Sequence, residues 1–303
     1  MNNAASPRRP WASLFSASAS YLIWGLFPLY WKLLGAVDAT ELIAHRVVWA
    51  LLLLLLLVWG QGRVRAFFTG LKEAKNLGTH ALSGALLSVN WLVYVWGVNA
   101  GHVIECSLGY FLVPLINVLL GRYVLKETLR ALQVASIGLA AAGVVTMVAV
   151  VGRPPWIALS IAGTFGFYGL LRKRSSFGPL LGLTAETLLL APLAAGYFLW
   201  QWQRGAGALG HVDTATTGLV LSTGVVTAIP LLLFAKGARG LSFTTLGLLQ
   251  YLAPTCQFLL GWLAYGEPMS EGRAWAFALI WLGLLLYSAD AAWNSRTPSA
   301  SRP

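Results

Sequence analysis

The chain carries few charged residues for its length, and acidic residues are the rarer kind. Charged side chains make up 10% of its 303 residues, with 10 acidic against 21 basic groups, whereas a soluble domain has about a quarter charged residues. Apolar residues make up 57% of the sequence, far more than a disordered chain contains. This composition excludes an ordinary soluble globule and predicts an integral membrane protein.

Cysteine and the common cofactor motifs are also scarce. The two cysteines, Cys106 and Cys256, both fall inside apolar stretches, which is typical of small packing residues and not of a disulfide framework or a metal cluster. The sequence has no phosphate-binding P-loop, no nucleophile elbow and no zinc-protease His-Glu pair. We therefore expect no metal, no cofactor and no enzymatic activity. An ATP-driven pump would need a motor supplied by a partner.

Ten apolar stretches have the length of about 20 residues that crosses a bilayer as a helix. In the first half they cover roughly 12–34, 39–60, 77–99, 103–125 and 131–151. In the second half they cover roughly 155–173, 178–200, 214–236, 241–264 and 273–293. The sequence thus predicts an all-α integral membrane protein with ten transmembrane helices and no large soluble domain.

The basic residues are distributed unevenly between the connections. With the N-terminus in the cytoplasm, 16 of the 21 basic residues fall in cytoplasmic segments and three in outer connections, while Lys32 and Arg46 lie in spans. Because Lys and Arg are enriched on the cytoplasmic side, the tails 1–11 and 294–303 are both predicted to be cytoplasmic. The run Arg172-Lys173-Arg174 is interpreted as a topology anchor. The net charge of +11 then indicates orientation in a lipid bilayer, and no nucleic-acid partner is expected.

Tryptophan placement supports the same layout. Indole rings prefer the headgroup region, and eight of the 14 tryptophans lie near predicted span ends. These eight are Trp11, Trp31, Trp59, Trp156, Trp200, Trp202, Trp275 and Trp293. The other six lie deeper, where packing against a neighbouring helix is the usual role of the ring.

An internal repeat relates the two halves of the chain. Pro114, Gly121 and Glu127 recur with an offset of 140 residues as Pro254, Gly261 and Glu267. The repeat predicts two five-helix units, 12–151 and 155–293. Because five is odd, the second unit starts on the opposite side of the membrane and is inverted, which is typical of secondary transporters. The alternative is a duplicated unit that serves as a static scaffold.

Two equivalent spans carry a polar stripe. Residues spaced by three and four share one helix face, and in the fourth span that face carries Ser107, Tyr110, Pro114, Asn117 and Gly121. The equivalents in the ninth span are Gly247, Gln250, Pro254, Gln257 and Gly261. Polar groups are costly against lipid, so both stripes are expected to face protein or an aqueous cavity, with the prolines as hinges. The alternative is that Asn117 and Gln257 only hold neighbouring helices together.

Charged residues gather near the start of the second span. Glu41 and His45 share a helix face and Arg46 follows directly, a cluster that suits proton movement or the binding of a charged substrate. The alternative is structural, with Asp38 and Glu41 capping the helix and Arg46 pairing with Glu41. Glu186 is the equivalent of Glu41 in the second half and lies near the inner face. We therefore expect the two acids to belong to opposite gates.

Several short motifs along the chain form a recognisable set. They are Trp24-Gly25, His45-Arg46, Asn90-Trp91, Ser107-Leu108-Gly109-Tyr110-Phe111 with Pro114 and Asn117, Phe167-Tyr168-Gly169, Arg172-Lys173, Glu186, Thr245-Leu246-Gly247, Gln250-Tyr251 and Pro254. From about residue 16 to residue 293 the chain resembles the RarD-like proteins of the EamA family, a branch of the drug/metabolite transporter superfamily. The resemblance implies a ten-helix carrier of the bacterial inner membrane. Helices one to four and six to nine of such a carrier surround a central cavity, and helices five and ten pack outside.

The resemblance also implies a function, namely export or exchange of amino acids, related metabolites or drugs. Together with the repeat it predicts a secondary transporter of a small organic solute that works by alternating access. The residues expected to contact substrate are Trp24, His45, Asn90, Tyr110, Asn117, Tyr168, Gln250 and Gln257. The residues expected in gating or coupling are Glu41, Arg46, Pro114, Glu186 and Pro254. A non-transporting membrane receptor or scaffold, or an integral membrane enzyme, is the alternative, and homo-oligomerisation is left open.

Overall fold

The computed structural model describes residues 10–124, 126, 128–238, 241, 245–246 and 249–296. Within these residues every regular element is a helix, as the composition predicts. Most of the two expected tails, together with Gly247 and Glu127 of the repeat, lies outside the described residues. The elements are α1 Pro10–Gly25, α2 Phe27–Leu33, α3 Ala39–Gly60, α4 Val64–Leu71, α5 Ala74–Asn99, α6 Val103–Val124, α7 Ala131–Val151, α8 Trp156–Arg174, α9 Pro179–Gln203, α10 Thr214–Ala238, α12 Leu252–Leu259, the π-helical turn η1 Leu260–Ala264, and α13 Glu271–Arg296.

Eight of the helical stretches are long and apolar enough to cross a membrane. The two expected spans outside this set are the sixth and the ninth. The sixth is α8, which ends in three basic residues, and the ninth is the short pair α12 and η1, whose helix is described from Leu252. A short helix, α4, lies where a loop is expected and buries Phe67. Local hydropathy therefore locates the helices, although it does not show their breaks.

The first expected span is one such case, because Leu26 divides it into α1 and α2. Pro28 lies in the first turn of α2, and since proline has no N–H, the carbonyl of Trp24 loses its donor within the helix. The side-chain amide of Gln257 in α12 donates to this carbonyl over 3.1 Å. The break in the helix thus becomes a contact between α1 and α12.

Eight of the described helices form a closed ring of contacts. Around the ring α1 packs on α10, α10 on α3, α3 on α9, α9 on α5, α5 on α8, α8 on α6, α6 on α12 and α12 on α1. Helices α1, α3, α5 and α6 come from the first half of the chain and the other four from the second half. The halves therefore alternate, and every contact between ring neighbours joins one half to the other.

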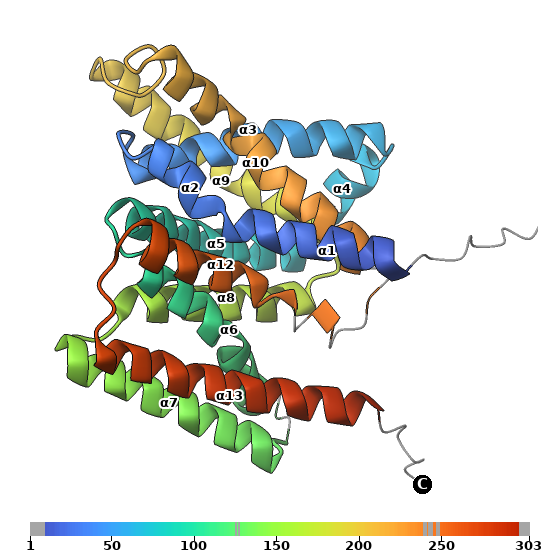
Figure 1. The fold of residues 1–303 in the computed structure, drawn as a ribbon. Helices are drawn as coiled ribbons and strands as arrows, with labels where there is room; N and C mark the ends of the chain where they lie inside the picture. Colours follow the sequence, from blue (N-terminus) through green and yellow to red (C-terminus); the bar gives the residue numbers. More distant parts are fainter. Residues whose placement is uncertain are drawn as a thin grey trace, which may run out of the picture.

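Two further helices, α7 and α13, pack against each other beside this ring (Figure 1). Their contact is close because Gly143 of α7 presents no side chain: a Cβ there would lie 2.6 Å from Cγ1 of Ile280. Helix α6 is the main link between the pair and the ring, through the cluster that contains Phe111 and Phe277. This agrees with the expectation that the fifth and tenth spans lie outside the central group.

The two ends of the bundle differ in what they carry. Helix α1 begins and α13 ends at the same end of the molecule, which we call the terminal end, and α4 lies there too (Figure 1). Exposed tryptophan rings occur near both ends, with Trp59 and Trp293 at the terminal end and Trp202 and Trp275 at the opposite, distal end. Trp31, expected among the exposed rings, is fully buried, because α2 turns inward after the break.

The contact between α7 and α13 can be tested with two glycines of the same helix. Gly143→Ala is expected to lower the melting temperature, because the added Cβ would lie 2.7 Å from the carbonyl of Ala276, and overpacking costs about 1–3 kcal/mol. Gly138 has nothing within 4 Å of the equivalent position, so Gly138→Ala is expected to be neutral or stabilising. Thermal unfolding in detergent measures both, and equal melting temperatures would contradict the close packing.

Candidate functional site

A buried arginine lies inside the ring, surrounded by aromatic side chains. Arg46 of α3 is 5% exposed, and its guanidinium carbon lies 3.8 Å from the ring centre of Trp91 in α5 and 5.5 Å from that of Trp31 in α2. Cation–π contacts contribute about 2 kcal/mol when desolvated, whereas an unpaired charge buried in a protein costs several kcal/mol. The aromatic rings alone therefore do not compensate for burial of this charge.

Among the described residues, Arg46 forms no ion pair with an acid and no side-chain hydrogen bond to an acceptor, so the expected alternative of a pair with Glu41 is not observed. Its Nε is buried without a hydrogen-bond partner, and the same holds for Nε1 of Trp31 and for the hydroxyl of Tyr94. The site formed by Arg46, Trp31, Trp91 and Tyr94, which we call the arginine site, is therefore rich in donors and poor in acceptors.

A hydrogen-bonded pair borders the arginine site. The hydroxyl of Tyr110 in α6 donates to Oδ1 of Asn90 in α5 over 3.3 Å, and the ring of Tyr110 packs edge-on against Tyr94. Nδ2 of Asn90 donates across the ring to the carbonyl of Ile161 in α8 and to Thr164. The structure thus brings two of the expected substrate-binding residues, Asn90 and Tyr110, beside Arg46.

A second buried polar cluster lies toward the terminal end and centres on Glu186 of α9. This fully buried carboxylate accepts a hydrogen bond of 2.7 Å from Ser83 and one of 3.3 Å from the hydroxyl of Tyr168. Nδ1 of His80 lies 3.4 Å away, and a nitrogen of Arg172 lies 3.7 Å away. Of the expected residues, Tyr168 and Glu186 therefore meet directly, and the carboxylate joins α5 to α8 and α9.

Arg172 reaches this cluster only because Gly182 has no side chain. A Cβ at Gly182 would lie 1.7 Å from Nη1 of Arg172. Arg172, interpreted from sequence as part of a topology anchor, has a side chain that is 16% exposed and turns toward the buried carboxylate of Glu186. The three residues His80, Ser83 and Arg172 were not expected in a site. A buried acid requires such partners, but sequence spacing does not reveal which helix supplies them.

The third cluster lies at the distal end, at the start of α3. Asp38 caps the helix by accepting from the N–H of Thr40, as the capping alternative predicts. Glu41 instead accepts from the backbone N–H of Ala208 in the α9–α10 connection, and its carboxylate lies 3.7 Å from Nε2 of His45. Nδ1 of His45 accepts from the indole of Trp49. Glu41 thus ties the first half of the chain to the second at the distal end.

The remaining expected residues are placed separately. Trp24 and Gln257 meet at the α1–α12 contact, where Oε1 of Gln257 is buried without a partner. Pro114 lies inside α6, while Pro254 is the third residue of α12. Gln250 is half-buried just before that helix. Of the ninth-span stripe, Gln257 thus contacts α1, while Gly247 lies outside the described residues.

Asn117 opens onto a cavity of its own. Its side chain is exposed and lines a space of about 440 Å³ toward the terminal end, together with Arg130, Gln133 and Tyr287. Arg130 forms an ion pair with the buried carboxylate of Asp290 in α13. This cavity lies where α6 meets the α7–α13 pair, beside the ring and not at the arginine site.

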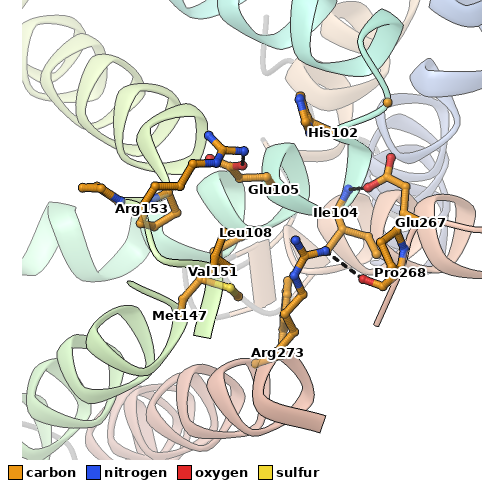
Figure 2. Close-up of a pocket in the computed structure, with 14 residues that line it drawn as sticks. His102, Ile104, Glu105, Leu108, Met147, Val151, Arg153, Glu267, Pro268 and Arg273 are labelled. Atoms are coloured by element: carbon orange, nitrogen blue, oxygen red, sulfur yellow. Dashed lines mark hydrogen bonds and ion pairs between the residues drawn. The ribbon is translucent and has the colours of Figure 1, made fainter. Parts of the chain in front are cut away.

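A distal pocket of about 190 Å³ lies between α6 and the connections that lead into α8 and α13 (Figure 2). Its acids serve as helix caps. Glu267 accepts from the N–H groups of Val103 and Ile104 at the start of α6, and Glu105 accepts from the N–H of Ile157 in α8. Figure 2 shows the bond from Ile104 to Glu267 and the ion pair of Glu105 with Arg153. Glu105 lies in the first turn of α6, yet it caps the neighbouring helix α8.

Comparison with known proteins defines the class. A model of the EamA-like transporter family matches residues 11–149. An uncharacterized transporter of Pseudomonas aeruginosa is 45% identical over 279 residues, covering 91% of this chain and 92% of that protein. Protein RarD of Streptomyces exfoliatus is 41% identical over 284 residues, covering 93% of this chain and 89% of that protein. A protein of known crystal structure shares the fold with a TM-score of 0.61 and 19% identity, over 92% of this chain and 98% of that chain.

The helical ring and these relatives define a multi-pass membrane protein of a transporter class. The chain belongs to the EamA-like transporter family of the drug/metabolite transporter superfamily, among its RarD-like members, as its motifs predict. Its membrane-spanning helices are consistent with the expected partnership with the lipid bilayer.

The dependence of the Glu186 cluster on Gly182 gives a prediction. Gly182→Ala is expected to expel the Arg172 side chain and to lower the melting temperature, because a buried carboxylate loses its charged partner, at a cost of up to about 3–5 kcal/mol. A double-mutant cycle with Glu186→Gln in detergent measures the coupling. Gly182→Ala should cost little once Glu186 is replaced. Equal costs in both backgrounds would show that Arg172 does not act through Glu186.

Proposed function

We propose that the protein is a secondary transporter that moves a small organic solute, such as an amino acid, a related metabolite or a drug, across the bacterial inner membrane by alternating access. It consists of two inverted five-helix repeats, 12–151 and 155–293, with both tails in the cytoplasm. The protein itself needs no cofactor and performs no covalent chemistry. The observation that carries this proposal is the strict alternation of the two halves around one ring.

The pattern of helix contacts supports a twofold relation between the halves. The 140-residue offset pairs α1 with α8, α3 with α9, α5 with α10 and α6 with α12. Exchanging the halves converts the contact α1–α10 into α8–α5, α3–α10 into α9–α5 and α1–α12 into α8–α6, and all of these contacts are present. The contacts α3–α9, α6–α12 and α7–α13 convert into themselves. Inverted units related in this way are the usual architecture of secondary transporters.

The two buried acids support gates at opposite ends. At the distal end Glu41 bonds to Ala208 of the other half, and toward the terminal end Glu186 bonds to Ser83 of the other half. In an alternating-access cycle one of these contacts opens while the other holds. Asn90 and Tyr110, between the two acids, then contact the solute beside Arg46, and Pro114 gives α6 a point of bending.

Transport by purified protein in vesicles tests this function directly. A thermal-shift screen in detergent first identifies a solute, since a ligand of the folded state raises its stability. Saturable uptake of that solute into vesicles is the expected result. A shift without uptake would favour a receptor or scaffold, and chemical change of the recovered solute would favour an enzyme.

Substitution of the two acids is expected to disturb opposite gates. A charge-assisted hydrogen bond contributes about 1.5–3 kcal/mol, so Glu41→Gln and Glu186→Gln should each shift the balance of access states by about tenfold or more and slow solute exchange. Asp213→Asn, which keeps the exposed cap of α10, is the matched control. Exchange of labelled solute across vesicles is the measurement. Unchanged exchange in both glutamine variants would remove the gating role.

The orientation can be tested independently. With both tails cytoplasmic, green fluorescent protein fused after residue 303 should fluoresce in cells, whereas alkaline phosphatase at that position should be inactive. Phosphatase inserted at Gly210, in the distal α9–α10 connection, should be active. The reverse pattern of activities would overturn the assignment from basic residues.

A further inference from the structure

The arginine site holds three hydrogen-bond donors that the protein does not satisfy. Arg46 Nε, Trp31 Nε1 and the Tyr94 hydroxyl are each buried without a partner, and each of these side chains is more than nine-tenths buried. Buried polar groups are normally paired, and a buried charge is normally paired with an opposite charge. Three such donors within one buried site indicate that the missing acceptor comes from another molecule.

The stacking of the guanidinium leaves its donors available. Trp91 covers one face of the group at 3.8 Å, and this contact uses the π surface, whereas all five N–H donors of a guanidinium point outward in its plane. A planar carboxylate accepts two parallel bonds from such an edge. The neighbouring hydroxyl groups of Tyr30 and Tyr110 donate to Leu219 and Asn90, and neither hydroxyl oxygen accepts a hydrogen bond from Arg46.

Among the residues that the structure describes, no acid pairs with Arg46. Glu41, on the same helix, is five residues before Arg46 and therefore points roughly 140° away around the helix. It is also bonded to Ala208, while Glu186 and Glu267 are bonded to Ser83 and to the start of α6. One positive charge matches one negative charge, so a monoanion satisfies the site.

We propose that the transported solute carries a carboxylate, and that this group binds to Arg46 with Trp31 and Tyr94 as additional donors. The aromatic faces of Trp91 and Phe27 then adjoin the apolar part of the solute. This assignment rests on the proposed transport function and adds the chemical class of the substrate to it. Arg46 is thereby a substrate-binding residue and not only a gating residue.

Matched pairs of acids and amides test the proposal on the full chain in detergent. The probes are phenylacetate, hexanoate and N-acetylleucine, each compared with its neutral amide, and the measurement is the melting temperature as a function of probe concentration. At least one acid is expected to raise the melting temperature in a saturable manner, while its amide does not. If no acid acts better than its amide, the proposal is overturned.

Substitutions then test whether the acid binds at Arg46. Arg46→Met should abolish the shift caused by the acid, and Arg46→Lys should weaken binding at least about tenfold, because a bidentate charged contact is lost. Arg63→Met, at an exposed arginine before α4, is the matched control and should bind like the parent protein. An acid-dependent shift that survives in Arg46→Met would overturn the proposal.

If the Arg46 variants do not fold, the variant Tyr94→Phe tests the same binding site. Because the hydroxyl has no protein partner, its removal should not lower the melting temperature of the ligand-free protein, yet it should weaken binding of the acid several-fold. Unchanged affinity in this variant would exclude the hydroxyl as a donor to the ligand and overturn the proposed site. If an acid binds through Arg46 but is not taken up into vesicles, only the proposed transport function is overturned. If amides are taken up and acids are not, only the carboxylate assignment is overturned.

Discussion

The absence of water at mid-membrane is the constraint on which this structure depends. A polar group buried among the helices must find its partner within the protein or in a bound solute, since lipid offers none. The carbonyl of Trp24, freed by Pro28, is paired with Gln257 of another helix. The carboxylate of Glu186 is paired with groups from α5 and α8. In both cases, satisfying one buried group joins the two halves of the chain.

Close approach of the helices is the second element of the architecture. Lipid is as apolar as the side chains, so helices in a membrane associate through van der Waals contact and polar bonds. Glycine permits that contact where halves meet: a Cβ at Gly109 would lie 2.8 Å from Ile161, and one at Gly224 would lie 2.5 Å from the backbone of Trp49. Because neighbours in the ring come from different halves, opening one end in the proposed transport cycle would move these packed surfaces together.

Sequence analysis predicts the local properties of the chain best. Hydropathy located the helices, and the motifs located the family. Among the site residues, Asn90 and Tyr110 do meet, as do Tyr168 and Glu186. Their partners were missed, however, because Ser83 and Glu186 are separated by 103 residues and only the order of helices in the ring brings them together.

Hydropathy, charge bias and the 140-residue repeat are properties of short segments, and each can be read without knowing which helices touch. Trp31 is a residue that such local properties do not place correctly. Its position near a span end suggests a contact with lipid headgroups, yet because the helix breaks at Leu26 the side chain is fully buried beside Arg46. Whether a buried charge is paired depends on every helix that surrounds it. The lone arginine therefore became visible only in the folded ring, since burial and the lack of a partner are properties of the whole assembly of helices.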